Sequence, residues 1–255
     1  MLHLHSRVLS IRPVAPNVFV LSLHCPELST TVAAGQFVNI LVHGGIEPLL
    51  RRPFSVYRTE GDSIEILFQR LGKGTALLAK AQEGQMIDLL GPLGHGYHLD
   101  EPSFETAVLI GGGLGVAPLP IATAVLRSAG KNIVTLLGAR TAELVIDGHL
   151  QNVHVATDDG TRGLHGTVVD LAAHVWDARI MPRSRIFACG PTPMLRALAA
   201  WAVSRNIPCE VSLEGQMACG IGICQGCPVE IVGQERKYAL MCKDGPVFNS
   251  RDIII

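Results

Sequence analysis

A run of 21 uncharged residues lies at 106–126, "TAVLIGGGLGVAPLPIATAVL". Its structure decides whether the chain spans a membrane or folds as a globular protein. Its length alone would allow it to cross a bilayer as a helix. Four glycines and two prolines interrupt it, however, and divide a β-like run at 107–110 from a helix-like run that begins at Leu119. Buried parallel strands are this apolar because both of their faces are covered. The run therefore predicts a strand, a glycine turn and a helix rather than a membrane span.

Strands and helices continue to alternate as far as residue 208, with β-like runs at 133–137 and 185–188 and helical patterns at 168–174 and 193–205. This alternation predicts a Rossmann-like parallel-sheet domain over 103–208. The region before it holds one helical pattern at 75–81 and short β-like runs at 7–11, 18–24, 37–42, 54–59, 63–68 and 86–90. These runs predict an antiparallel β-barrel domain over 1–102.

Composition excludes several classes of protein. The chain has 255 residues, of which 48% are hydrophobic, so it can bury a core of ordinary density. Its net charge of -1 gives no basic excess for binding nucleic acid. Seven cysteines are an odd number in a chain too large to need disulfides, which favours ligand or redox roles. Arginines and prolines interrupt the first 27 residues, which argues against a signal peptide and leads us to expect a cytoplasmic protein.

Three of the cysteines form a short loop motif near the C-terminus. Cys219, Cys224 and Cys227 follow a C-x4-C-x2-C pattern, and Cys242 follows after a longer gap. This spacing is typical of plant-type [2Fe-2S] sites, in which four thiolates hold two irons. Two alternatives are a four-cysteine zinc site and a set of buried free cysteines. Zinc sites of this kind usually pair two short cysteine knuckles, whereas here the fourth cysteine stands alone. The motif predicts a small [2Fe-2S] subdomain over 209–255.

Two motifs in the predicted barrel suit a flavin. In "RRPFSVYR", Arg52, Phe54 and Ser55 offer a cation for a phosphate, a flat ring and a hydroxyl for a ring nitrogen, although a core aromatic and a solvated charge explain them equally well. In "LFQRLGKGTALLAK", Gly74 and Thr75 come just before a predicted helix, where Thr75 can cap and free N–H groups can hold a pyrophosphate. Together they favour a dinucleotide flavin.

The glycine turn "GGGLGVAP" predicts a second nucleotide site, because it opens a helix after a buried strand. Gly111 and Gly113 fit the dinucleotide fingerprint, whereas Val116 occupies its third glycine position. No acid ends the next strand to hold a ribose 2'-hydroxyl, and Arg140 could contact a 2'-phosphate instead, so the motif leaves NAD and NADP open.

A further motif, "FACGPTPML", places Cys189 and Gly190 at the carboxyl edge of the sheet, where such folds bind ligands, although a small buried cysteine is an equal alternative. We interpret Asp158 and Asp159 as part of a turn before a glycine rather than as a catalytic pair. The histidines, His3 and His5 among them, show no spacing with an acid that is typical of metal ligands.

In this order, the motifs resemble those of the ferredoxin-reductase superfamily. Within it, the sequence is most similar to the electron-transfer subunits of class 1B, NAD-dependent dihydroorotate dehydrogenases. Four stretches carry the resemblance, which spans nearly the whole chain: "RRPFSV", "ATDDGTRGLHGTVVDL", "LEGQMACGIGICQGCPV" and "MCKDGPVF". The cysteine block and the last stretch are the most specific, whereas the glycine turn fits many reductases.

The resemblance implies a role for each matching position. FAD would contact Arg52, Pro53, Phe54, Ser55, Leu67, Phe68, Gln69, Gly74 and Thr75. Phe54 replaces the tyrosine that is common in the superfamily, so ring stacking is kept and a phenolic hydrogen bond is lost. The cluster would be held by Cys219, Cys224, Cys227 and Cys242. NAD, which the resemblance favours over NADP, would use the glycine turn and the CGP motif: Gly111, Gly112, Gly113, Gly115, Gly190 and Pro191. Ser55 and Cys189 would lie beside the reacting rings as the candidate catalytic residues.

The resemblance also implies a function in pyrimidine biosynthesis. Electrons would leave dihydroorotate at the FMN of a separate catalytic subunit and pass through the cluster and FAD to NAD+. The chain would then be an oxidoreductase that is incomplete without its partner, in a heterotetramer of two plus two subunits, with no nucleic acid or membrane involved. Two alternatives stay open: a free-standing NAD(P)H reductase serving an oxygenase, a hydrogenase or a sulfur-reducing system, and a non-enzymatic iron–sulfur redox sensor.

Overall fold

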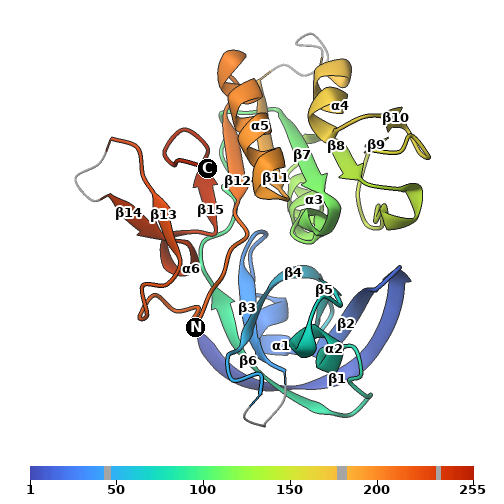
Figure 1. Cartoon of the computed structure of the whole chain (residues 1–255), viewed down its shortest axis with the longest axis vertical. Helices are drawn as coiled ribbons and strands as arrows, with labels where there is room; N and C mark the ends of the chain where they lie inside the picture. Colours follow the sequence, from blue (N-terminus) through green and yellow to red (C-terminus); the bar gives the residue numbers. More distant parts are fainter. Residues whose placement is uncertain (43–46, 177–182, 234–236) are drawn as a thin grey trace.

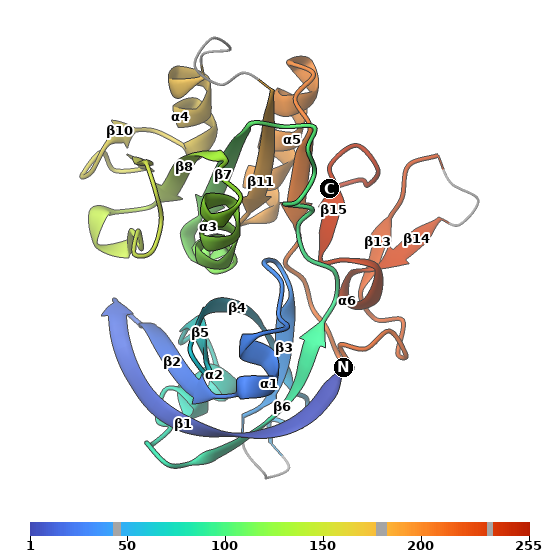
Figure 2. The same cartoon turned by 180° about the vertical axis from the view of Figure 1, so that it is seen from behind.

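The computed structural model describes residues 1–42, 47–176, 183–233 and 237–255. A β-barrel occupies one half of the molecule and a parallel sheet with its helices occupies the other, while a small β-hairpin projects beside both (Figures 1 and 2). This arrangement confirms the predicted fold class, an antiparallel barrel followed by a Rossmann-like domain with a small cysteine-bearing segment near the C-terminus.

The barrel closes in the antiparallel order β1-β2-β5-β4-β3-β6. Its strands are β1 (Leu2–Ala15), β2 (Val18–His24), β3 (Phe37–Leu41), β4 (Arg52–Glu60), β5 (Ser63–Gln69) and β6 (Met86–Leu93). Strand β1 is much longer than the predicted run at 7–11 because it serves two neighbours. Its first residues pair with β6 and its later residues pair with β2. The first residues are mostly polar and exposed, so they lack the apolar pattern that identifies a strand.

The second sheet has the order β10-β9-β8-β7-β11-β12-β15. Its strands are β7 (Thr106–Gly112), β8 (Asn132–Ala139), β9 (Val153–Thr157), β10 (Leu164–His165), β11 (Ser184–Cys189), β12 (Cys209–Ser212) and β15 (Val247–Asn249). All of its pairs are parallel except β12 with β15. The chain order reverses between β7 and β11, so the carboxyl ends of these two strands form the crevice where ligands bind in open α/β sheets.

Helices cover both faces of this sheet. They are α3 (Leu119–Ser128), α4 (Val168–Val175) and α5 (Thr192–Ser204). Of the shorter helices, α1 (Pro26–Ser29) and α2 (Lys73–Leu78) lie with the barrel, and α6 (Met241–Asp244) lies beside the hairpin (Figure 1). On β7, Leu109 packs in one core with α3 and the barrel, whereas Val108 and Ile110 pack in a second core with α4 and α5. The first core contains residues of both the barrel and the sheet, so it joins these two parts of the molecule. The 21-residue uncharged run is thus a strand, a tight turn and a helix, as predicted.

The C-terminal segment is divided between two structures. Strands β13 (Pro228–Glu230) and β14 (Tyr238–Leu240) form the hairpin, whereas β12 and β15 lie in the large sheet. The large sheet therefore includes residues 209–212 and 247–249, which we expected in the cluster subdomain. In β12, Glu210 is only 2% exposed and pairs with Arg185 at 2.7 Å, which explains why so polar a segment can form a buried strand.

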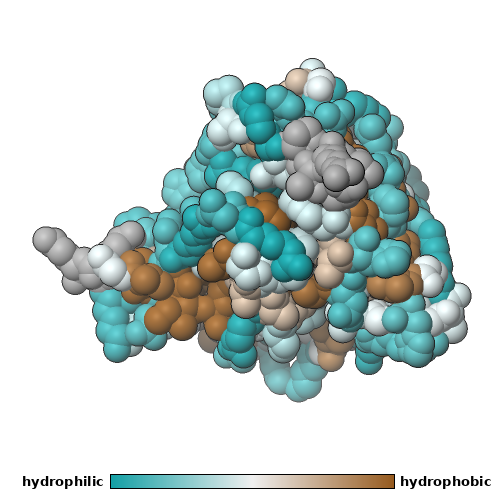
Figure 3. Space-filling model, turned by 90° about the horizontal axis from the view of Figure 1, so that it is seen from above, coloured by the Kyte–Doolittle hydropathy of each residue, from teal (hydrophilic) through white to brown (hydrophobic). Residues whose placement is uncertain are grey.

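The surface shows where apolar side chains remain uncovered. Seen from above, hydrophobic residues gather over the hairpin and the C-terminal end of the chain (Figure 3). Val232 is 50% exposed and Ile254 is 57% exposed. In the described part of the chain, no helix is both long enough and apolar enough to span a membrane.

Candidate functional site

A cavity of about 490 Å³ opens between the barrel and the carboxyl end of the sheet. It brings together most of the residues predicted for the flavin and four from the glycine turn and the CGP motif: Pro53, Phe54, Ser55, Leu67, Phe68, Gln69, Thr75, Gly112, Gly113, Cys189 and Pro191. The Phe54 ring packs edge-on against Phe68, with ring centroids 5.9 Å apart, and gives the cavity an apolar wall. A mostly apolar cavity of this size with a few polar groups suits a flat ring system.

Two of the predicted flavin residues, Arg52 and Gly74, lie together beside this cavity rather than in its lining. A Cβ atom on Gly74 would lie 3.4 Å from Arg52 Nε, so the guanidinium group rests against the first turn of α2. Arg52 Nη1 donates hydrogen bonds to the carbonyl oxygens of Leu50 at 2.7 Å and Arg51 at 3.2 Å, which fix its orientation. A fixed cation beside the first turn of a helix is suited to a phosphate.

Thr75 caps helix α2 as predicted, but it does so from inside the helix rather than from the position before it. Helix α2 begins at Lys73, so Gly72 is the N-cap and Thr75 is the third helical residue. Thr75 Oγ1 accepts hydrogen bonds from the N–H groups of Leu71 at 2.8 Å and Gly72 at 3.1 Å. The hydroxyl thus holds the loop that leads into the helix, while the side chain also lines the cavity.

A second cavity, of about 700 Å³, lies over the carboxyl ends of β7, β8 and β9. It shares Gln69, Gly112, Gly113, Leu114 and Pro191 with the first cavity, so the two spaces meet at the glycine turn. A ligand in one cavity can therefore touch a ligand in the other. Hydride transfer needs this kind of contact.

The predicted nucleotide residues divide into two groups. Gly112, Gly113 and Pro191 line the second cavity, and Gly113 has a φ of +53° with no atom near its missing side chain. Gly115 instead packs directly against the end of β11. A Cβ at this position would lie 2.1 Å from the Cys189 carbonyl oxygen, so only glycine allows the turn to come this close. Gly111 and Gly190 line neither cavity, and they also serve close packing.

Three charged residues line the part of the second cavity that is not shared with the first. Arg140 lies there as predicted, but Asp158 and Asp170 line the same space. Asp170 accepts hydrogen bonds from the backbone N–H and the hydroxyl of Thr167, and these bonds lower the pKa of its carboxyl group. Later segments thus bring two carboxylates to this cavity, although no acid directly follows β8. Asp159 does form the predicted turn, because its Oδ1 accepts from Thr161 N at 3.0 Å.

Ser55 and Cys189, the two predicted catalytic residues, both line the first cavity. Cys189 Sγ lies 4.0 Å from Oε1 of Glu214, which lines the cavity as well. Burial and the nearby Glu214 raise the pKa of the Cys189 thiol far above its usual range, and burial also raises the pKa of the Glu214 carboxyl group. Cys189 is thus a neutral thiol at the crevice rather than a thiolate nucleophile.

The four predicted cluster thiols fall into two pairs. Cys227 Sγ and Cys242 Sγ are 3.2 Å apart and buried. Cys219 and Cys224 form the other pair, which is more exposed. Cys219 Sγ accepts hydrogen bonds from the N–H groups of Ile221 at 3.5 Å and Cys224 at 3.4 Å. Although burial acts to raise it, these N–H groups lower the pKa of Cys219 to about 6.

The pairing bears on the choice between a cluster and zinc. A single tetrahedral zinc ion needs all four sulfurs within about 3.8 Å of one another, since Zn–S bonds are about 2.3 Å long. Across the described ranges, only one group of three metal-ligating side chains has its ligand atoms within 4.8 Å, and it contains none of these thiols. Two pairs of thiols fit two irons instead, and backbone N–H groups directed at sulfur are a feature of iron–sulfur sites.

The cluster loop is attached directly to the barrel. Asn39 of β3, which is 1% exposed, donates from Nδ2 to the Cys219 carbonyl oxygen at 3.1 Å. Gly220 has a φ of +70°, and a Cβ there would lie 2.5 Å from Asn39 Nδ2. Further along, Leu213 N donates to the Pro246 carbonyl oxygen at 2.9 Å, and both residues line the first cavity. The cysteine loop and the first cavity are thus connected through the barrel and the C-terminal segment.

Sequence analysis missed the contribution of the C-terminal segment to the first cavity. Ser212, Leu213, Glu214, Gly215, Met217 and Pro246 all line it, together with Phe37 from the barrel. Their nearness depends on the pairing of β12 with β15, which joins distant parts of the chain. The "LEGQM" and "DGP" stretches were visible as specific parts of the resemblance, but no local pattern ties them to a flavin cavity.

Comparisons with known proteins show the family of the chain. The family model of the iron–sulfur cluster binding domain of dihydroorotate dehydrogenase B matches residues 214–254. The chain is 39% identical over 255 residues to the dihydroorotate dehydrogenase B (NAD+) electron transfer subunit of Bacillus caldolyticus, with 97% of each chain covered. The corresponding subunit of Geobacillus kaustophilus gives the same identity and coverage.

Solved structures extend the similarity. An NADH-dependent reduced ferredoxin–NADP oxidoreductase has a TM-score of 0.84 and 29% identity, and the match covers 98% of this chain and 89% of that one. A ferredoxin–NADP+ reductase from Neisseria gonorrhoeae shares the fold at 20% identity and a TM-score of 0.66, with 79% and 91% of the two chains covered. Since the curated relatives match along almost their entire length, the chain belongs to the family of dihydroorotate dehydrogenase B electron transfer subunits.

Proposed function

We propose that this chain carries electrons from a dihydroorotate-oxidising partner subunit through a [2Fe-2S] cluster and FAD to NAD+, in the synthesis of pyrimidines. The names of its relatives support the substrate, the acceptor and the existence of a partner. The observation that carries the proposal is the meeting of the two cavities at the glycine turn, with the paired thiols attached to the first cavity.

In this proposal, Cys219 and Cys224 hold one iron, and Cys227 and Cys242 hold the other. The exposed Cys224 and its neighbour Ile223, which is 75% exposed, would face the partner. Uncovered Val232 and Ile254 on the same subdomain provide further apolar surface for docking. We propose that the partner is the FMN-containing catalytic subunit and that the complex is a heterotetramer of two plus two subunits.

The flavin residues have two tasks. Arg52, Gly74 and Thr75 would hold and orient the pyrophosphate at the first turn of α2, where Arg52 supplies a fixed positive charge. Pro53, Phe54, Ser55, Leu67, Phe68 and Gln69 would exclude water from the ring system, with the Ser55 hydroxyl beside a ring nitrogen. When bound, the flavin supplies the change between hydride transfer and single-electron transfer that nicotinamide and the cluster require.

The nicotinamide nucleotide would enter the second cavity. Gly112, Gly113 and Pro191 would contact it, while Gly111, Gly115 and Gly190 shape the turn. Cys189 would pack its neutral thiol against the nicotinamide ring at the junction. Asp158 and Asp170 beside Arg140 favour a ribose hydroxyl over a 2'-phosphate, because two carboxylates outweigh one guanidinium. This charge balance supports NAD as the nucleotide.

The test is to express the chain with and without its catalytic subunit under anaerobic conditions. We expect the lone chain to oxidise NADH with an artificial acceptor but to leave dihydroorotate unchanged, and the complex to reduce NAD+ with dihydroorotate. A lone chain without NADH oxidation would point to the redox sensor instead. Failure to form a complex with the dihydroorotate-oxidising subunit would favour the free-standing reductase.

A further inference from the structure

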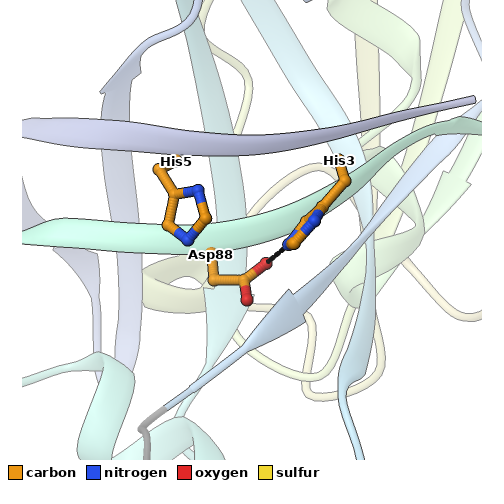
Figure 4. A group of neighbouring side chains, drawn as sticks. All are labelled: His3, His5 and Asp88. Atoms are coloured by element: carbon orange, nitrogen blue, oxygen red, sulfur yellow. Dashed lines mark hydrogen bonds and ion pairs between the residues drawn. The ribbon is translucent and has the colours of Figure 1, made fainter.

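Two histidines and an aspartate meet on the outer wall of the barrel (Figure 4). His3 and His5 are two residues apart on β1, so both point to the same face of the strand. Asp88 on β6 is the register partner of His5. None of the three lines the flavin cavity or the nucleotide cavity. The group corrects the interpretation that these histidines lack a nearby acid, since the acid is 85 positions away from His3 along the chain.

The ligand atoms already lie close together. His3 Nε2 is 2.8 Å from Asp88 Oδ1, and one nitrogen of each histidine and one carboxylate oxygen all lie within 4.8 Å of one another. The two imidazole rings have centroids 5.2 Å apart. No other group of three metal-ligating side chains meets this distance in the ranges that the structure describes.

We propose that His3, His5 and Asp88 bind a divalent transition-metal ion, with Zn2+ as the ion that fits best. Zinc commonly takes three protein ligands from nitrogen and oxygen and completes a tetrahedron with water. Zn–N and Zn–O bonds of about 2.1 Å require ligand atoms about 3.4 Å apart, so His3 Nε2 and Asp88 Oδ1, now 2.8 Å apart, would have to separate slightly. The His3 side chain is 55% exposed, so its ring can rotate to reach this geometry.

Arg51 contacts the same Asp88 oxygen as His3 does. Its Nη2 lies 2.9 Å from Asp88 Oδ1, while its Nη1 donates to the backbone oxygens of Asp88 at 3.3 Å and Asn39 at 3.4 Å. Burial acts to raise the pKa of Asp88, but Arg51 and His3 lower it below its usual range. The carboxylate is thus ionised and oriented before a metal arrives. Hydrogen bonds of this kind commonly fix metal-ligating carboxylates.

A metal here would join the start of β1 to β6. This end of β1 pairs with β6 through Leu2–Arg7, next to the closing seam of the barrel. Zinc that binds only the folded barrel stabilises it by mass action. The site is chemically distinct from the iron site because it offers imidazole and carboxylate rather than thiolates.

The test uses the protein with its cluster and FAD in place, so that the thiols remain occupied by iron. Zn2+ is titrated by calorimetry into the chelator-washed protein, and crystals soaked in zinc are measured at the zinc absorption edge. His5→Ala and Asp88→Asn remove one ligand each. His24→Ala is the matched control, because His24 is an exposed histidine on the neighbouring strand β2.

We expect one zinc per chain and an anomalous peak between the three side chains. His5→Ala and Asp88→Asn should each weaken binding by at least about tenfold, the lower end of the loss seen when a metal site is disturbed. His24→Ala should bind as the unaltered protein does. Zinc should also raise the thermal midpoint of the unaltered protein but not that of His5→Ala. The proposal is wrong if the unaltered protein takes up no zinc, if His5→Ala binds equally well, or if the peak lies elsewhere.

Discussion

The cluster site and the flavin cavity are built in opposite ways. The proposed cluster site takes three of its four thiols from one nine-residue loop, in which two backbone N–H groups point at Cys219. The flavin cavity takes its lining from segments that run from Phe37 in the barrel to Pro246 near the C-terminus. A local loop can be altered by one substitution, whereas an assembled cavity depends on the packing of the barrel, the sheet and the C-terminal segment.

This difference predicts that cluster binding and nucleotide binding can be lost separately, because few contacts connect the two sites. Loss of the cluster should leave the nucleotide cavities intact, because few of their lining residues come from the cysteine loop itself. The link is Asn39, which connects β3 to the loop, together with the contact between Leu213 and Pro246. Substitutions in the loop, in the cavity and in the link should therefore give effects of different kind and size.

The largest effect is expected from Gly220→Ala in the loop. Its positive φ and the 2.5 Å approach to Asn39 Nδ2 leave no room for a side chain, so the loop must change shape. We expect most of the cluster absorbance to be lost while FAD stays bound. Gly148→Ala is the control, because it lies far from the cysteine loop in the sequence and the nearest atom to a Cβ there would be Tyr57 Oη, at 3.7 Å. Normal cluster content in Gly220→Ala would show that the loop is less constrained than it looks.

A smaller effect is expected from Arg52→Ala beside the cavity. Loss of a charge-assisted hydrogen bond to a phosphate costs about 1.5 to 3 kcal/mol, which weakens FAD binding about tenfold or more. The cluster spectrum should not change. Flavin retention is measured after serial dilution, with Arg127→Ala as the control because Arg127 is exposed on α3. Full FAD occupancy of Arg52→Ala under dilution would contradict its assignment to the pyrophosphate.

The smallest effect is expected from Asn39→Ala in the link. The substitution removes one hydrogen bond to the Cys219 carbonyl oxygen, worth about 1 kcal/mol. For a chain of this size it should lower the thermal midpoint by about 2–4 °C. Cluster and FAD content should both be kept. A loss of cluster as severe as that of Gly220→Ala would mean that the barrel, rather than the loop backbone, holds the thiols in place.

The limits of sequence reasoning follow the same division. The C-x4-C-x2-C spacing predicts the cluster ligands from a local pattern, and this ligand set stays a prediction. The prediction of a strand, a turn and a helix at 106–126 also rests on a local pattern, and the structure confirms it. Strand β12 was missed because Glu210 looks too polar for a buried strand until Arg185 is seen beside it. The meeting of His3 with Asp88 depends on the register between β1 and β6, and no local pattern encodes that register.

The most direct test of separable sites is Cys242→Ala, measured in two half-reactions. Cys242 lies outside the cysteine loop, so its loss should disturb the loop backbone least. We expect the [2Fe-2S] absorption and dihydroorotate-dependent NAD+ reduction with the partner to disappear, while NADH oxidation by an artificial acceptor continues, since hydride transfer needs only nicotinamide and flavin in contact. Cys25→Ala should keep both activities. A Cys242→Ala protein that keeps a normal cluster and full activity with its partner, or one that loses both half-reactions, would contradict this account.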